Sequence, residues 1–369
     1  MGKLCAEWSL TAGNIAVHEV HTRLVVRRRG PMTVPPMQPP GGRQSWPPNG
    51  PTPPSKPSRM PWILIGISLS AVLALVVGVL VWQGTSARGP GSSGPIGSTI
   101  GDDRSVRMLS EEDPVCDGWT GAADKLAKVQ ESWTSTDRST SATDWTPEQR
   151  AVIESVGSAM TSAADEFEVL LPRAEHIVLR ELIAQTIVYL RLFVERIPSY
   201  VEVDSRIAGV AGNFSGAVTY MCSAVPLVPT NSGRVELAES HVADPNSLVP
   251  FITHRDIACE RLVGLFDRQN AVLRGWAATD SSIPAAHWSA EQETLNRAAR
   301  TVISGDVAEV QEVAAATDNG LMQDLLNAQA LYMSAFADAI PTYAPDDAQL
   351  WSVATYLGGG LSAACKVEL

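Results

Sequence analysis

Apolar side chains recur at helical spacing through most of the chain beyond residue 115. Within residues 257–276 they follow one face of a helix, at Leu262, Leu265, Phe266, Val272, Leu273 and Trp276. Comparable patterns predict a first set of helices at 116–133, from 146 and at 175–197, and a second set at 257–276, from 289 and at 318–340. No convincing run alternates between apolar and polar residues as a half-buried strand does. The sequence therefore predicts an all-α fold class with four-helix bundles.

The predicted starts of two helices carry a capping-box pattern. Thr146 is followed three residues later by Gln149, and Ser289 by Gln292. In this pattern the hydroxyl and the glutamine side chain each bond a backbone N–H that the helix leaves without a partner. Pro147 directly after Thr146 also suits the first position of a helix. We therefore expect helices to begin at these two places.

The predicted third helix of each set ends at a proline. Pro198 and Pro341 cannot continue the backbone hydrogen-bond ladder. Asp204 and Asp347 follow, each just before a fourth apolar stretch. Because aspartate is a preferred N-cap residue, we expect their carboxylates to cap the fourth helices.

The two sets of helices are copies of each other. A shift of 143 residues superimposes them without a gap between the anchoring cysteines. The shift aligns rare residues: Cys116 with Cys259, Trp133 with Trp276, Trp145 with Trp288, Tyr200 with Tyr343 and Cys222 with Cys365. We therefore predict a duplicated module, with one copy at 111–224, a linker at 225–253 and a second copy at 254–369.

Four cysteines belong to this repeat, and four cysteines allow three pairings. The pairings Cys116–Cys222 and Cys259–Cys365 map onto each other under the shift, and each joins the first helix of a copy to its fourth. We predict these two disulfides. A bridge between Cys222 and Cys259 across the linker, or buried free thiols, are the alternatives.

Residues 61–83 form a long apolar run, in which 62–82 carry no charged side chain and, apart from two tryptophans, only Ser68 and Ser70 are polar. As a helix, such a segment extends about 31 Å, close to the hydrocarbon thickness of a bilayer. Trp62 and Trp82 lie at its two ends, where indole rings favour the headgroup region. The run is longer than a typical signal-peptide core, so we predict a retained transmembrane helix.

The flanks of this segment predict an orientation. Basic residues precede it and acidic ones follow, which places the N-terminus in the cytoplasm and the C-terminal domain outside the cell membrane. Residues 1–60 are a predicted disordered, Pro-rich cytoplasmic tail, available to a cytoplasmic partner or serving only as a tether. Met32 opens the Pro-rich run, and we expect translation to start there, leaving 1–31 untranslated. Residues 84–110 are a predicted flexible stalk.

The charge is divided in the same way. Residues 1–83 carry eight basic and two acidic side chains and the remainder carries 20 and 38, so the net charge of −12 separates into +6 and −18. The acidic C-terminal part is unsuited to nucleic acid, which is bound through basic side chains.

No pattern in the chain specifies a reaction. Phosphate-binding, nucleophile-elbow and zinc-protease motifs are absent from the sequence, and the histidines do not fall at metal-ligand spacing, so we predict no catalytic residue, no cofactor and no metal site. The aromatic residues shared by the copies are a candidate ligand surface: Trp133, Trp145, Tyr200, Trp276, Trp288 and Tyr343. The alternative is that they are packing residues.

Two pairs of repeated carboxylates are weaker candidates. Asp137 aligns with Asp280, and Glu148 with Glu291. They could serve as acid/base groups, but acidic residues also gather at helix starts because of the helix dipole.

The plan of the whole chain resembles that of uncharacterised single-pass membrane proteins of mycobacteria and related actinobacteria. The resemblance covers the Pro-rich tail, the tryptophan-flanked span and the cysteine-linked helical domain, and it carries no active residues. The leading hypothesis from the whole chain is a non-enzymatic protein of the cell envelope whose tandem domains bind a protein or envelope ligand. The alternative is an envelope-modifying enzyme with a carboxylate-containing pocket between the bundles.

Overall fold

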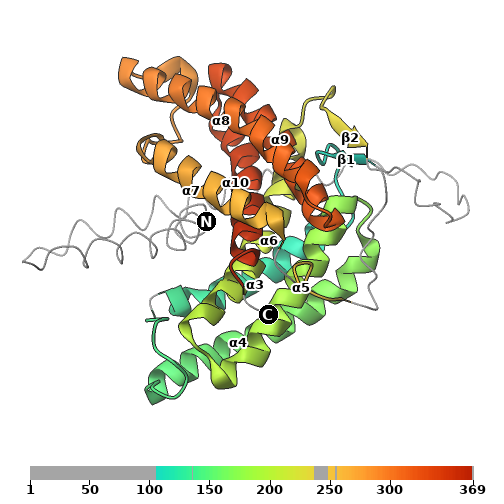
Figure 1. Cartoon of the computed structure of the whole chain (residues 1–369), viewed down its shortest axis with the longest axis vertical. Coiled ribbons are helices and arrows are strands. Elements are labelled where there is room, and N and C mark those ends of the chain that lie inside the picture. Colours follow the sequence, from blue (N-terminus) through green and yellow to red (C-terminus); the bar gives the residue numbers. More distant parts are fainter. Residues whose placement is uncertain (1–104, 135, 237–247, 254–255, 368–369) are drawn as a thin grey trace, which may run out of the picture. The chain divides into compact units, whose positions relative to one another are not determined.

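The computed structural model describes residues 105–134, 136–236, 248–253 and 256–367 (Figure 1). This part of the chain is almost entirely helical. Its helices are α3 (Cys116–Thr134), α4 (Pro147–Leu170), α5 (Ile177–Arg196), α6 (Ser205–Ala224), α7 (Ile257–Ala277), α8 (Ala290–Ala316), α9 (Gly320–Ala339) and α10 (Ala348–Ala364). The predicted all-α character is confirmed, and each predicted helix lies within a few residues of an observed one.

Short elements connect the helices. Two three-residue strands, β1 (Ser105–Arg107) and β2 (Arg234–Glu236), pair antiparallel with Val106 opposite Val235. Single 3₁₀ turns occupy Leu171–Arg173, Ile197–Ser199, Glu202–Asp204, Val225–Leu227, Ala285–His287, Ile340–Thr342 and Pro345–Asp347. The strand pair is absent from the sequence prediction, because three residues are too few to show an alternating pattern.

The predicted capping boxes form at the starts of α4 and α8. Gln149 N–H donates to Thr146 Oγ1 at 3.2 Å, and Thr146 N–H donates to Gln149 Oε1 at 3.0 Å. Ser289 and Gln292 repeat both bonds, at 3.2 and 3.0 Å. These reciprocal bonds satisfy two backbone donors that a helix start would otherwise expose.

The prediction that the carboxylates of Asp204 and Asp347 cap α6 and α10 is wrong, because they bond backbone groups that precede these helices. The Asp204 carboxylate accepts from the N–H of Val201 at 2.8 Å, and Asp347 accepts from the N–H of Ala344 at 2.7 Å. Neither side chain bonds the helix that follows it. Both aspartates instead close the 3₁₀ turn before the helix, because the chain enters α6 and α10 already in a helical conformation.

Both disulfides have the predicted pairing. Cys116 is bonded to Cys222, with Cα atoms 5.6 Å apart, and Cys259 to Cys365, with Cα atoms 5.3 Å apart. Each bridge joins the start of the first helix of a set to the end of the fourth, α3 to α6 and α7 to α10.

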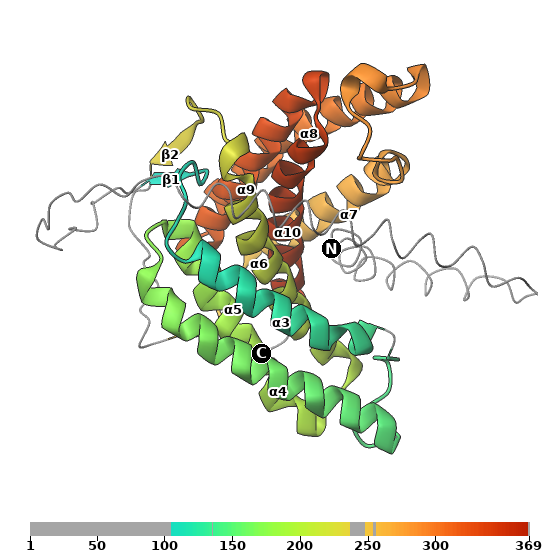
Figure 2. The ribbon, with the colours of Figure 1, turned by 180° about the vertical axis from the view of Figure 1, so that it is seen from behind.

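The two sets of helices meet mainly along α6 and α10, which pack against each other (Figures 1 and 2). Glycines make this approach close. A Cβ atom on Gly216 of α6 would lie 2.6 Å from Tyr356 Cδ1, and one on Gly359 of α10 would lie 2.5 Å from Asn213 Oδ1. The neighbouring Gly360 leaves room in the same way for the ring of Phe214. Small residues in this stretch therefore serve helix packing.

We expect Gly216→Ala to lower the free energy of unfolding by about 1–3 kcal/mol, because the added methyl group overlaps the Tyr356 ring. Gly209 on the same helix is the matched control, since its added Cβ would meet nothing within 4 Å. Gly209→Ala should raise stability by up to about 1 kcal/mol through helix propensity alone. Urea denaturation measures both, and equal effects would contradict close packing at Gly216.

The end of the predicted stalk is part of the folded core. Val106, Met108 and Leu109 are buried, and Leu109 N–H donates to the Tyr332 hydroxyl of α9 at 3.0 Å. The stalk prediction is therefore wrong for 105–110, where apolar side chains give the segment a surface to bury. Residues 84–104 of the predicted stalk lie outside the described residues.

The linker packs on both sets of helices where the structure describes it. The Gln185 side chain on α5 donates to Val249 O at 3.1 Å and accepts from Phe251 N–H at 3.1 Å. Asn319, the N-cap of α9, donates to Phe251 O at 2.6 Å. The Phe251 ring also lies against Tyr189, with ring centroids 6.3 Å apart. This segment therefore contributes to the junction between the sets.

The predicted single-pass membrane location is corrected. Among the residues that the structure describes, no helix combines the length and the apolar character needed to cross a bilayer. The predicted span at 61–83 and the predicted tail at 1–60 lie outside those residues.

Candidate functional site

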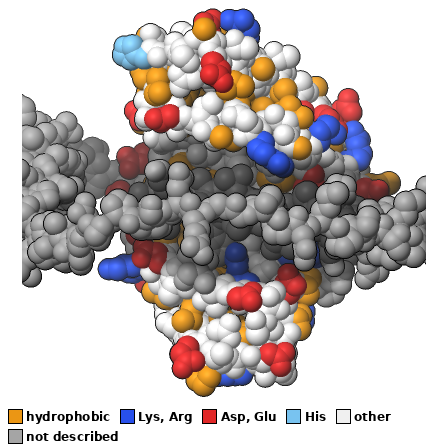
Figure 3. Space-filling model, turned by 90° about the vertical axis from the view of Figure 1, so that its left-hand side faces the viewer, with side chains coloured by type: hydrophobic (Ala, Val, Ile, Leu, Met, Phe, Trp, Pro, Cys, Tyr) orange, Lys and Arg blue, Asp and Glu red, His pale blue; other side chains and the backbone are white. Residues whose placement is uncertain are grey.

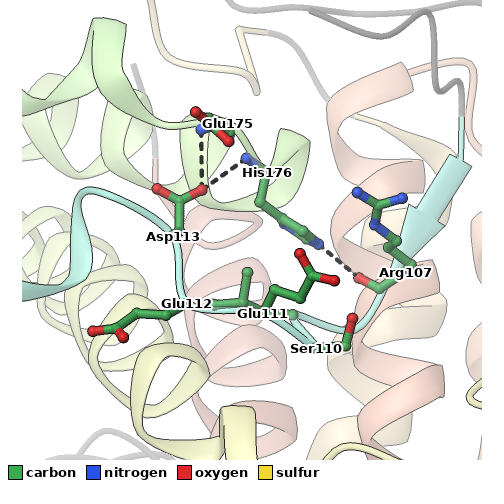
Figure 4. A pocket seen from close by; sticks show the side chains of 8 residues that line it. Arg107, Ser110, Glu111, Glu112, Asp113, Glu175 and His176 are labelled. Carbon is green, nitrogen blue, oxygen red and sulfur yellow. Dashed lines mark hydrogen bonds between the residues drawn. The ribbon is translucent and has the colours of Figure 1, made fainter. Parts of the chain in front are cut away.

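A pocket of about 240 Å³ lies where the segment after β1 passes the start of α5 (Figure 4). Its walls come from two parts of the chain that are far apart in sequence. The lining residues are Arg107, Leu109, Ser110, Glu111, Glu112, Asp113, Glu175 and His176.

Asp113 ties these two parts together. Its Oδ2 accepts from the backbone N–H groups of Glu175 at 3.0 Å and His176 at 2.8 Å, and its Oδ1 accepts from Val115 N–H at 3.1 Å. The side chain is buried, with 5% of the residue exposed. Backbone N–H groups at a helix start carry a partial positive charge, so a carboxylate is well placed there. Asp113 thus holds the N-cap residue of α5 and the residue before it in place.

His176 lines the pocket, is buried and makes a second tie. Its Nε2 lies 3.1 Å from Arg107 O (Figure 4). Because a carbonyl oxygen only accepts, Nε2 must carry the proton and donate it. This bond fixes the imidazole ring against the end of β1.

The pocket contains serine, histidine and aspartate, but they do not form a catalytic relay. Such a relay needs the aspartate to orient the histidine ring and the histidine to accept a proton from the nucleophile. Here Asp113 bonds the backbone of His176 and not its ring, and the Nε2 proton is directed at Arg107 O. The arrangement therefore holds the pocket together and does not activate Ser110.

The pocket mouth is negatively charged. Glu111, Glu112 and Glu175 are exposed and surround it together with one exposed cation, Arg107. In Figure 4 the Glu111 carboxylate reaches toward the His176 ring. Neighbouring carboxylates attract a cationic group and discourage an anionic one. The geometry therefore suits a lysine or arginine side chain from another molecule.

The face drawn in Figure 3 has a different character. Acidic, basic and apolar side chains are interspersed on its coloured parts. Acidic and basic side chains are mixed on this face, whereas acidic side chains predominate at the pocket mouth.

The aromatic residues of the predicted ligand surface that belong to the first set of helices are buried. Trp133, Trp145 and Tyr200 are 1%, 7% and 2% exposed. Trp145 lies 5.4 Å from Tyr200 between ring centroids, and the Tyr200 hydroxyl donates to Arg138 O at 2.8 Å. Trp145 Nε1–H donates to Thr140 O at 2.9 Å. These contacts fasten the loop between α3 and α4 to the end of α5.

The equivalent contacts in the second set of helices are similar but more open. Tyr343 donates to Ser281 O at 2.7 Å, and Trp288 Nε1–H donates to Ile283 O at 2.9 Å. Trp288 and Trp276 are only half-buried. All six predicted aromatic residues are thus packing partners to some degree, and none of them lines the pocket.

The repeated carboxylates also have local roles. Asp137 accepts from Ser139 N–H at 2.9 Å, and Asp280 accepts from Ser282 N–H at 2.9 Å. The bonds from Ser139 lower the pKa of Asp137. Glu148 and Glu291 lie in the first turns of α4 and α8. No group of three or more metal-ligating side chains gathers among the described residues.

Sequence reasoning missed the pocket. The acidic run Glu111–Asp113 is visible in the sequence, and His176 precedes a long apolar helix. Nothing local connects them, because the bond from His176 N–H to Asp113 spans 63 residues. The available signal was that the start of α5 has no side-chain cap of its own. This could have prompted a search for a carboxylate elsewhere in the chain that bonds there.

Comparison with known proteins gives a family. An uncharacterised protein of Mycolicibacterium smegmatis (strain MKD8) is 29% identical over 373 residues, which cover 92% of this chain and 98% of that protein. No solved structure matches. A family model described as mycobacterial ESX-1 associated protein matches residues 99–369, a range that contains every described residue. The resemblance to uncharacterised mycobacterial proteins is confirmed at this level, and the chain belongs to the family of mycobacterial ESX-1 associated proteins.

Proposed function

We propose that this chain is a non-enzymatic docking protein that binds a protein partner related to ESX-1 secretion, and that the acidic pocket receives a basic side chain of that partner. The family description supports the association with ESX-1. The observation that carries the proposal is the pocket itself, where Glu111, Glu112 and Glu175 are exposed at the mouth. The groups that could perform chemistry, Asp113 and His176, are engaged with the backbone.

A duplicated helical module, with copies at 111–224 and 254–369, is part of this proposal. The two disulfides support it, because each joins residues 106 positions apart. Two equivalent backbone hydrogen bonds also support it, since Ala142 N–H donates to Tyr200 O and Ala285 N–H donates to Tyr343 O, both at 2.9 Å. Duplication would give the protein a rigid frame that holds the pocket in a fixed position.

We expect the triple substitution Glu111→Gln, Glu112→Gln and Glu175→Gln to weaken partner binding about tenfold, because each exposed ion pair contributes up to about 1 kcal/mol. The measurement is crosslinking of the tagged full chain in a mycobacterial host, with quantitative mass spectrometry of captured ESX-1 components. Binding through these carboxylates should also weaken as salt is added.

The matched control removes three exposed carboxylates elsewhere: Glu131→Gln, Glu154→Gln and Glu195→Gln. This variant has the same net charge as the pocket variant and should bind like the unmodified chain. If ESX-1 components are captured equally by both variants, the pocket is not the docking site. If the unmodified chain captures none of them, the proposed association itself is wrong.

A further inference from the structure

Two carboxyl groups are completely buried between the two sets of helices. Glu181 lies on α5 and Asp324 on α9, and both residues are 0% exposed. These helices are in contact with each other. The same shift of 143 residues that aligns the two copies places Glu181 on Asp324. An acidic residue therefore occupies this buried position in both copies, and the two meet at the junction.

The two groups interact. Burial is the main reason why the pKa of Glu181 is raised well above its usual value, and the charge of Asp324 and a hydrogen bond with Asp324 raise it further. The positive charge of Arg180 acts in the opposite direction and is the smallest of these causes. Two carboxyl groups can share a hydrogen bond only while one of them is protonated. Like charges in a site without water cannot both ionise without a large cost.

In the described part of the chain, no buried Lys or Arg lies on the helices packed against α5 and α9. The other helices packed on α5 are α4 and α6, and neither has a buried ionisable side chain. The turn before α5 carries Arg173, which is exposed. The neighbours of α9 are α8, which has no buried ionisable group, β1, whose Arg107 is exposed, and α10, which has the buried Tyr356.

Each of the two helices also carries one buried tyrosine eight residues further along. They are Tyr189 on α5 and Tyr332 on α9, and burial raises the pKa of both phenols. These hydroxyls therefore stay protonated over the range in which a carboxyl pair titrates.

We propose that Glu181 and Asp324 share a proton across the α5–α9 contact, and that this pair makes the packing of the two copies against each other dependent on pH. With the shared proton in place the junction holds one buried charge and a carboxyl–carboxyl hydrogen bond. Loss of the proton puts two like charges into the same dry site. The junction then loosens, while the disulfide within each copy keeps that copy closed.

The sign of the pH dependence follows from the direction of the shift. The pKa of Glu181 is higher in the folded chain than its ordinary value of 4.5. The contribution to stability is therefore fully present below about pH 4.5 and is lost as the pH rises through the folded pKa. Between the ordinary pKa of Glu181 and its pKa in the folded chain, the unfolding equilibrium constant rises about tenfold for each pH unit, relative to a chain without this group.

Urea denaturation of the oxidised full chain between pH 4.5 and 8 tests the proposal. We compare the unmodified chain with Glu181→Gln and with Asp324→Asn, which each leave a neutral amide at the pair. Glu181→Gln should lose the extra tenfold change per pH unit. Asp324→Asn leaves Glu181 buried beside an amide, so the change should persist but move to lower pH. Glu195→Gln is the matched control, because Glu195 is exposed on the same helix, and it should keep the pH dependence of the unmodified chain.

Hydrogen exchange followed by mass spectrometry, corrected for the intrinsic effect of pH, locates the change. Protection of amides in α5 and α9 should fall with rising pH in the unmodified chain, whereas protection in α3 and α4 should not. This measurement needs no variant, so it decides the matter even if a substitution prevents folding. Parallel stability curves for all the chains, or protection in α5 and α9 that does not change with pH, would overturn the proposal.

Discussion

Replacing Cys116 and Cys222 together by serine is expected to lower the free energy of unfolding by about 3–5 kcal/mol. The bridge joins residues 106 positions apart, and it reduces the conformational freedom of the unfolded chain. In the chain-entropy account, closing a loop of about 100 residues is worth up to about 4.7 kcal/mol. Urea denaturation with and without the bridge measures the loss.

The second bridge provides the control. Cys259 and Cys365 are also 106 positions apart, so replacing this pair should cost a similar amount. The unmodified chain treated with a reducing agent should lose stability comparable to both losses together. A loss below about 1 kcal/mol for either pair would contradict stabilisation through the unfolded state.

Trp119→Ala is expected to cost about 3–5 kcal/mol, the range for removing a large aromatic side chain from a packed core. Trp119 is 0% exposed, and its ring stacks on Phe167 with centroids 3.9 Å apart. Its Nε1–H donates to Thr219 Oγ1 at 3.1 Å. The side chain thus joins α3 to both α4 and α6, and its loss would leave a cavity between three helices.

Trp119→Phe separates the two contributions. A phenyl ring can still stack on Phe167 but cannot donate to Thr219, so this variant should lose about 1–2 kcal/mol. Thermal or urea denaturation of the three chains gives the comparison. Equal losses for alanine and phenylalanine would mean that the hydrogen bond, and not the buried ring, holds these helices together.

The repeat made much of this fold predictable. Once Cys116 aligned with Cys259, the symmetry of the shift selected the disulfide pairing from three possibilities. The capping boxes at Thr146 and Ser289 marked helix starts, because both partners lie within one turn of each other. Signals of this kind depend only on residues close in sequence, so they can be found without knowing the fold.

Contacts between distant segments were not predictable in this way. The β1–β2 pair joins Val106 to Val235, and each strand has only three residues. The pocket depends on Asp113 reaching His176 across the fold. Polar residues in such positions look like ordinary surface residues in the sequence, because their partners come together only when the helices pack.

The buried carboxyl pair lies between these two cases. Glu181 interrupts an apolar helix, and the shift of 143 residues places it on Asp324. That coincidence was available in the sequence as a sign of a buried acidic position. The meeting of the two groups was not, because it depends on how α5 and α9 pack against each other.

The position of the disulfides has a mechanical consequence. Each bridge carries force directly from the start of its first helix to the end of its fourth, across 106 positions of sequence. At roughly 3.3–3.6 Å per extended residue, each bridge prevents roughly 350–380 Å of chain from extending under tension. Only the polypeptide outside the loops, such as that between Cys222 and Cys259, could stretch. Under load the two bridged segments would act as short covalent links, and the oxidation state of four sulfur atoms would set how far the chain can reach.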